Sequence, residues 1–140
     1  GGFLSEALGF GFQAGAMIGG IVGGIVGGQI YKGFTKPVGK GFDTFKELKN
    51  EIGSAGPNKE WHHIVEQCQI KKSGFSPRQI HNTKNIIAID KTIHRQISGY
   101  YASKQAMTGG QTVRNWLAGQ SYQKQYEFGL QVLKMFKVLK

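Results

Sequence analysis

Hydrophobic residues follow different spacings along this chain, and each spacing predicts a type of secondary structure. Residues 42–52 place phenylalanine and leucine at helical intervals among lysines, which predicts a short amphipathic helix. Residues 60–68 mix β-branched and aromatic side chains and predict a strand or extended arm, and residues 86–89 form a compact apolar strand. Apolar residues one turn apart return in residues 92–103, so we expect a helix there.

Residues with turn and cap preferences mark where further elements begin and end. Ser76 and Pro77 suit the N-cap and the first position of a short helix. The pair Gly109–Gly110 interrupts the pattern, and residues 112–139 are then expected to be mostly helical, with a bend near Gly119. Together these elements predict an α+β fold that is rich in helix, with additional helices at the C-terminal end.

The segment 1–34 is rich in glycine, and residues 7–31 carry no charge. Glycine recurs at every fourth position from Gly11 to Gly27, which on a helix would align these residues in one groove for close packing. The uncharged stretch is long enough for a membrane-spanning helix, which needs about 20 residues. We therefore expect a glycine-zipper segment that is either helical, with transient membrane contact through residues 7–31, or a flexible linker.

Turn-forming residues separate a basic segment from the C-terminal part of the chain. Lysines alternate with apolar residues over 35–56, and residues 53–58 are a run of turn formers. We expect residues 35–56 to be a basic linker that contains the short amphipathic helix, and residues 57–140 to be the functional domain. Since the chain starts at Gly1 without a methionine, we also expect it to be a segment of a longer protein.

The charge balance narrows the class of partner. The sequence has 18 Lys and Arg against 8 Asp and Glu, a formal net charge of +10. Such an excess favours a polyanionic partner: nucleic acid, an anionic membrane or an acidic protein. The single cysteine, Cys68, excludes an internal disulfide framework and is expected to be a buried structural thiol.

Three of the 4 histidines are spaced so that they can share one site. His62 and His63 are adjacent, and His94 follows on the predicted helix. An imidazole with an ordinary pKa near 6.5 can bind a metal ion or accept a proton at neutral pH. With the basic charge, this predicts chemistry on a nucleic-acid phosphate. Because neighbouring strand residues point to opposite faces, both His62 and His63 can serve one site only if the strand ends or twists there. His81 receives no role.

The order of these motifs resembles the ββα-metal nucleases, also called HNH or His-Me finger nucleases. A strand with a histidine pair, a strand preceded by asparagine and a helix with histidine follow one another in WHHIVEQ, NTKNIIAID and DKTIHRQISGYY. This resemblance covers about residues 60–103. More narrowly, residues 56–140, with GPNKEWHHIVEQ and WLAGQSYQKQYEFGL, are similar to the C-terminal nuclease domains of bacterial LXG-type polymorphic toxins.

The resemblance implies a ββα-metal core within residues 57–140 and a role for each matching residue. His63 would be the general base that deprotonates the nucleophile. His62 and His94 would bind one divalent ion, Mg, Mn, Zn or Ni, at the scissile phosphate. Asn85 would hold the loop between the strands, or orient His63 through its side-chain carbonyl.

One position departs from the family pattern. Where some members carry a third histidine ligand, this chain has Ser98, a poor ligand for a transition metal. The third ligand is then water, Glu60 or absent, and metal-independent cleavage stays open. Lys84, Lys91 and Arg95 lie close in sequence to the site and can contact flanking phosphates.

The resemblance also implies a biological setting. It implies a secreted antibacterial toxin that acts as an endonuclease in the cytoplasm of a target bacterial cell. A cognate immunity protein would neutralise it, and an acidic face is expected on that protein. RNA is favoured as the substrate, because its 2′-hydroxyl is a built-in nucleophile and an incomplete metal site can then suffice. Alternatives are a DNA endonuclease with the same site, a non-catalytic nucleic-acid-binding module, and a membrane-active protein that uses residues 7–31.

Overall fold

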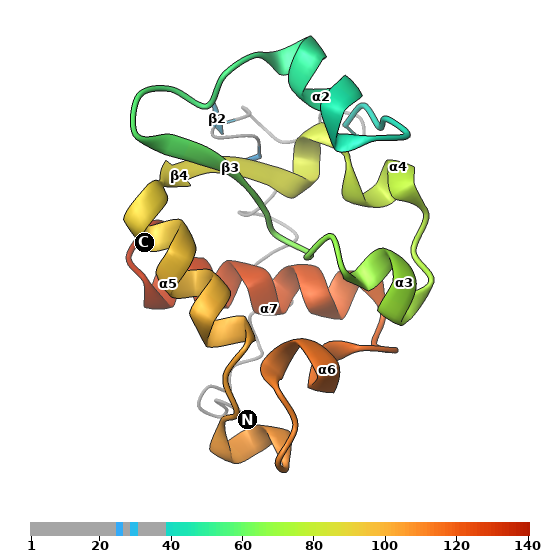
Figure 1. Ribbon diagram of the computed structural model, residues 1–140, viewed down its shortest axis with the longest axis vertical. Helices are drawn as coiled ribbons and strands as arrows, with labels where there is room; N and C mark the ends of the chain where they lie inside the picture. The colour runs from blue at the N-terminus through green and yellow to red at the C-terminus, as the bar shows by residue number, and fades with distance from the viewer. Residues whose placement is uncertain (1–24, 27–28, 31–38) are drawn as a thin grey trace.

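The computed structural model describes residues 25–26, 29–30 and 39–140 (Figure 1). Within these residues the chain is α+β: helices predominate, and the strands form two small antiparallel sheets of two strands each. This confirms the predicted helix-rich mixed fold. No helix in the described ranges is long and apolar enough to cross a membrane.

The glycine-rich segment is described at four positions, and these positions are strands. β1 (Ile25–Val26) pairs antiparallel with β2 (Gln29–Ile30), so the helical interpretation is wrong there. β-branched side chains favour an extended backbone, which is consistent with strands at these positions. The remainder of residues 1–34, and with it most of the predicted membrane-contact segment 7–31, lies outside the described residues.

α2 (Phe45–Ile52) is the amphipathic helix that the sequence predicts. It begins after Thr44 and not at Phe42, because the Thr44 hydroxyl caps it by accepting a hydrogen bond from the backbone N–H of Glu47 at 3.1 Å. Leu48 of this helix is fully buried. α2 therefore packs into the described fold, although its place in the sequence suggests a linker.

β3 (Lys59–His63) and β4 (Ile86–Asp90) form the second antiparallel sheet, and α5 (Lys91–Tyr101) follows at once. The Asp90 carboxylate caps α5 by accepting a hydrogen bond from the backbone N–H of Thr92 at 2.8 Å. α5 packs against both strands (Figure 1). The end of β3 thus lies beside α5, and two histidine-bearing segments meet there.

The segment between β3 and β4 contains α3 (Gln69–Ser73), α4 (Pro77–Ile80) and the 3-10 turn η3 (Thr83–Asn85). The Ser76 hydroxyl caps α4 by accepting from the backbone N–H of Gln79, and the Gln79 side chain accepts from the Ser76 N–H in return. Proline at the first helical position completes this start. The predicted beginning of the helix is confirmed.

The C-terminal part contributes η4 (Ala106–Thr108), α6 (Val113–Leu117) and α7 (Tyr122–Met135). Gly119 separates α6 from α7 with a φ of 89°, a left-handed conformation that suits glycine. The predicted bend is therefore a break between two helices. α7 supplies much of the hydrophobic core, to which it contributes Phe128, Leu130, Val132 and Leu133.

Gly129 of α7 lets this helix approach the chain that leaves β3. A Cβ at this position would lie 2.4 Å from the backbone oxygen of Ile64. We expect Gly129→Ala to lower the free energy of unfolding by about 1–3 kcal/mol, measured by urea denaturation. Gly99→Ala is the control: a Cβ there meets nothing within 4 Å. That substitution should raise stability by about 0.5–1 kcal/mol. If Gly129→Ala has the same free energy of unfolding as the wild type, α7 does not pack closely against Ile64.

Candidate active site

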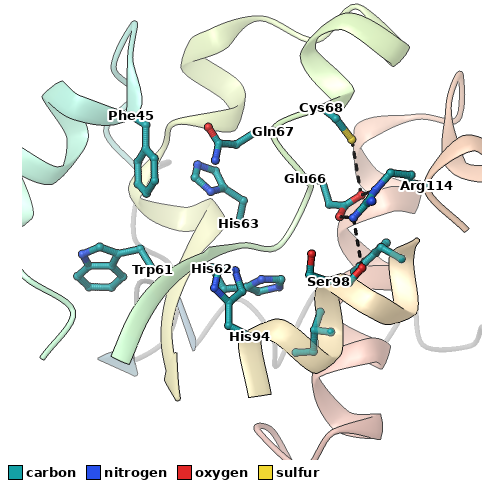
Figure 2. A pocket seen from close by; sticks show the side chains of 12 residues that line it. Phe45, Trp61, His62, His63, Glu66, Gln67, Cys68, His94, Ser98 and Arg114 are labelled. Atoms are coloured by element: carbon teal, nitrogen blue, oxygen red, sulfur yellow. Dashed lines mark hydrogen bonds and ion pairs between the residues drawn. The ribbon is translucent and has the colours of Figure 1, made fainter. Parts of the chain in front are cut away.

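A cavity of about 310 Å³ opens where the end of β3 meets α5 (Figure 2). All three predicted histidines line it, His62 and His63 from β3 and His94 from α5. Ser98 of α5 and Arg114 of α6 also form part of its wall. Side chains that the sequence places far apart therefore share one pocket.

The two neighbouring histidines reach the cavity on different sides, because β3 ends at His63. His62 lies against α5, with its ring centroid 5.3 Å from that of His94. His63 lies toward α2, with its ring centroid 4.6 Å from that of Phe45. Since the strand stops at this point, the cavity can extend around its end and admit both imidazoles. The strand therefore ends where it has to end if both histidines are to serve one site.

His62 has a ring nitrogen without a hydrogen-bond partner among the described residues. This nitrogen is Nε2, and it is buried. Burial lowers the pKa of His62 to about 3, and electrostatic repulsion from His94 acts in the same direction. The imidazole is therefore neutral at pH 7. A buried nitrogen without a partner costs about 1–3 kcal/mol, a cost that calls for an explanation such as a ligand.

Glu60 holds His94 in place. Its Oε1 atom lies 2.7 Å from His94 Nδ1. This hydrogen bond is the main reason why the pKa of Glu60 is lowered. Metal-binding histidines commonly use their second ring nitrogen in this way, on a carboxylate that sets the ring orientation. Glu60 therefore supports His94 and is not part of the cavity wall.

The donors around the cavity fit a metal ion in part. His62 Nε2 and His94 Nε2 have no hydrogen-bond partners among the residues that the structure describes. Ser98, a poor ligand for a transition metal, lines the cavity and is exposed. Across residues 39–140 and the four described residues of β1 and β2, no group of three His, Cys, Asp or Glu side chains could hold a metal. The arrangement offers two nitrogen ligands, and solvent or substrate would supply the others.

His63 contacts a fourth histidine that sequence reasoning missed. Its Nε2 atom lies 3.2 Å from Nδ1 of His81, the residue that ends α4. Burial lowers the pKa of His63 to about 3, and the charges of His81, His62, His94 and Lys49 contribute in the same direction. His63 is therefore neutral at pH 7 and has a lone pair, but so low a pKa makes it a weaker base than a free imidazole.

Asn85 holds the loop that follows β3. Its side-chain Oδ1 accepts a hydrogen bond from the backbone N–H of Val65 at 2.8 Å, and its Nδ2 donates to the carbonyls of Val65 and Ile80, both at 3.0 Å. The residue is fully buried. The resemblance implies that Asn85 either holds this loop or orients His63. The bonds support the first role, because the side-chain carbonyl accepts from Val65 and not from His63.

The three predicted phosphate contacts lie outside the cavity wall. Lys91 and Arg95 are exposed on α5, and their charges add to the effect of His94 in lowering the pKa of Glu60. Both cations therefore lie near that carboxylate. Lys84 is half-buried, and its backbone carbonyl accepts a hydrogen bond from the Tyr126 hydroxyl at 2.7 Å.

Arg114 is a cavity residue without a signal in the sequence, because 48 positions separate it from its partner Glu66. Its Nε and Nη2 atoms donate to the two Glu66 oxygens at 3.1 and 2.6 Å (Figure 2). Such a paired geometry fixes the guanidinium plane. Nη1 has no hydrogen bond to a described residue. Cys68 is half-buried, and not fully buried as the sequence predicts. Burial raises the pKa of its thiol, which donates to Glu66 at 3.6 Å, so the thiol stays protonated at neutral pH.

The pocket therefore combines neutral imidazoles, which can accept protons or bind a cation, with a fixed guanidinium, which can bind an anion. These groups suit chemistry on a phosphate ester. Comparison with protein-family models, curated proteins and solved structures finds no match to this chain.

Proposed function

We propose that this chain is the nuclease part of a bacterial toxin and that it cleaves phosphodiester bonds, with RNA as the favoured substrate. One observation carries the proposal: three histidines from the end of β3 and from α5 line one cavity together with a guanidinium. Two of these histidines, His62 and His63, are neutral at pH 7. The formal net charge of +10 supports a polyanionic substrate.

The proposed architecture is a ββα-metal, or HNH-like, core within residues 57–140. Its support is the chain order β3, β4, α5, with histidines at the end of the first strand and on the helix. Asn85 comes directly before β4 and holds the connection after β3. α2 lies before residue 57, and its Phe45 also lines the cavity, so experiments should retain it.

In the proposed mechanism His63 is the general base. Its neutral imidazole takes the proton of the nucleophile, the 2′-hydroxyl in RNA or a water molecule in DNA, as that oxygen attacks phosphorus. The bond from phosphorus to the leaving oxygen of the chain then breaks, and that oxygen takes a proton from solvent. Arg114 is held by Glu66 with its Nη1 free to donate to a phosphate oxygen. Negative charge that develops on the phosphate oxygens would be stabilised by this cation.

His62 and His94 are the residues that would hold one divalent ion, with Glu60 orienting His94. When bound, such an ion supplies a positive charge that stabilises the phosphate oxygens during cleavage. Two nitrogen ligands hold an ion less firmly than three. RNA, which needs no activated water, is therefore the substrate that this ligand set suits better.

Substrate binding and inhibition follow from the charge. Lys84, Lys91 and Arg95 remain the proposed contacts for flanking phosphates, and binding should weaken as salt concentration rises. We propose a cognate immunity protein with an acidic face, because opposite charge speeds association with a basic partner. The proposed setting is that of a secreted toxin that acts in the cytoplasm of a target bacterium.

The proposal is tested with the purified full chain, total RNA and plasmid DNA, each in EDTA or with Mg, Mn, Zn or Ni. We expect RNA to be degraded faster than DNA, EDTA to slow cleavage and an added ion to restore it. No strand scission in either substrate with any ion would refute the nuclease assignment in favour of non-catalytic binding. If DNA is cleaved and RNA stays intact, the protein is a DNA endonuclease and not an RNase. If EDTA does not change the cleavage rate, the mechanism does not use a metal ion.

A further inference from the structure

His81 is buried against the candidate base and is itself firmly placed. Only 6% of its surface is exposed. Its backbone N–H donates to the carbonyl of Pro77 at 2.7 Å, and its own carbonyl accepts from the N–H of Phe42 at 2.8 Å. The Phe45 ring stacks on the His81 imidazole, with an angle of 5° between the planes. Main-chain bonds on both sides and an aromatic neighbour thus fix the position of this ring.

The contact between the two rings is a single hydrogen bond with two alternative directions. His63 Nε2 and His81 Nδ1 lie 3.2 Å apart, so one of these nitrogens must carry the proton. If His63 donates, both rings are protonated at Nε2. If His81 donates, both are protonated at Nδ1. The direction of this bond therefore decides which nitrogen of His63 keeps a lone pair.

Only one direction leaves His63 able to act as a base. When His63 donates through Nε2, its Nδ1 lone pair is free. That atom has no hydrogen bond to a described residue and is not sealed from solvent. In the other direction His63 Nδ1 carries a proton and Nε2 is occupied, so neither nitrogen can accept one. The first direction also gives both rings the Nε2–H form, which neutral imidazole side chains favour.

We infer that His81 is a positioning residue for His63: its Nδ1 accepts the Nε2–H of His63 and so leaves the Nδ1 lone pair of His63 free for the nucleophile. This inference rests on the proposed nuclease function. Besides His81, three charged or titratable residues lie near His63. His62 is on the same strand, Lys49 is on α2, and His94 is on α5. Among the described residues none of these three donates to or accepts from His63, so His81 is the neighbour that can set its tautomer.

The test uses two variants of the full chain that differ in where they place a polar atom. The side-chain amide of asparagine occupies the position of a histidine Nδ1, whereas that of glutamine reaches the position of Nε2. His81→Asn therefore keeps an acceptor for His63, and His81→Gln moves it away. Nitrogen-15 NMR of histidine-labelled protein reports the tautomer of each ring, and the His63 signals are those absent from the His63→Gln protein.

We expect His63 to be an Nε2–H tautomer in the wild type and in His81→Asn, and a mixture in His81→Gln. For RNA cleavage, His81→Gln should lower kcat by about 10- to 100-fold, with KM changed by less than about twofold, and His81→Asn should keep most activity. An Nδ1–H tautomer of wild-type His63 would overturn the inference, as would a folded His81→Gln protein with unchanged tautomer and kcat. Because the wild-type spectrum decides alone, a variant that fails to fold leaves the test intact.

The NMR readout also separates this inference from the proposed function. If His63 has the expected tautomer but neither RNA nor DNA is cut under any condition, the nuclease assignment fails while the hydrogen bond to His81 stands. If RNA is cut but His63 is the Nδ1–H tautomer, the nuclease assignment stands and His81 is not the positioning residue.

Discussion

Replacing His63 with glutamine is expected to slow RNA cleavage by the full chain about 100- to 10,000-fold, the usual contribution of a general base. Glutamine is close to histidine in size and polarity, but its amide cannot take a proton from the nucleophile at neutral pH. The measurement is the initial cleavage rate of a fluorescent RNA with enzyme in excess, so that product release does not limit the rate.

The controls separate loss of chemistry from loss of fold. His63 is only 6% exposed, so unfolding of each variant should be followed by circular dichroism in urea. His63→Asn is a second, smaller replacement in case glutamine does not fit. Met135→Gln changes an exposed residue of α7 away from the cavity and should cleave at the wild-type rate. Wild-type cleavage by a folded His63→Gln protein would remove His63 from the mechanism.

Replacing Asn85 with alanine is expected to lower the free energy of unfolding by about 3–5 kcal/mol. Alanine removes three hydrogen bonds at once. It leaves the N–H and carbonyl of Val65 and the carbonyl of Ile80 without their side-chain partner, in a place that is fully buried. Each such backbone group costs about 1–3 kcal/mol when it is left unpaired away from water.

Urea denaturation at pH 7 measures this loss, and Asn50→Ala provides the matched control. Asn50 is exposed on α2, so its replacement should change stability by less than about 0.5 kcal/mol. A loss of less than about 1 kcal/mol in Asn85→Ala would show that the loop after β3 is held by other contacts.

Most helices and strands of residues 39–140 could be predicted, because local interactions specify them. Ser76 caps its helix through a hydrogen bond from a residue three positions ahead. Gly119 breaks the chain between α6 and α7 through its own backbone preference. At β1 and β2 the helix predicted from the glycine repeat is wrong. A spacing of four residues fits a helix, but the residues at these positions pair as antiparallel strands.

The sequence named the main candidate residues and the supporting Asn85 and Glu60, but missed two other supporting residues, His81 and Arg114. Adjacent histidines and a histidine on the next helix are visible in a linear pattern, so His62, His63 and His94 could be named. His81 could not, since its pairing with His63 depends on how α4 and α2 fold back over the end of β3. Arg114 was missed for the same reason, as α6 reaches the cavity only through tertiary packing.

The amino-acid sequence was enough to predict the main strands and helices after residue 39, the excess of positive charge and the three histidines that line the cavity. These follow from side-chain chemistry and from interactions within a few residues. The partners of those histidines depend on tertiary packing: Glu60 contacts His94, His81 contacts His63, and no described residue binds His62 Nε2. Such contacts join segments up to tens of residues apart, and burial of the core, not local preference, brings them together.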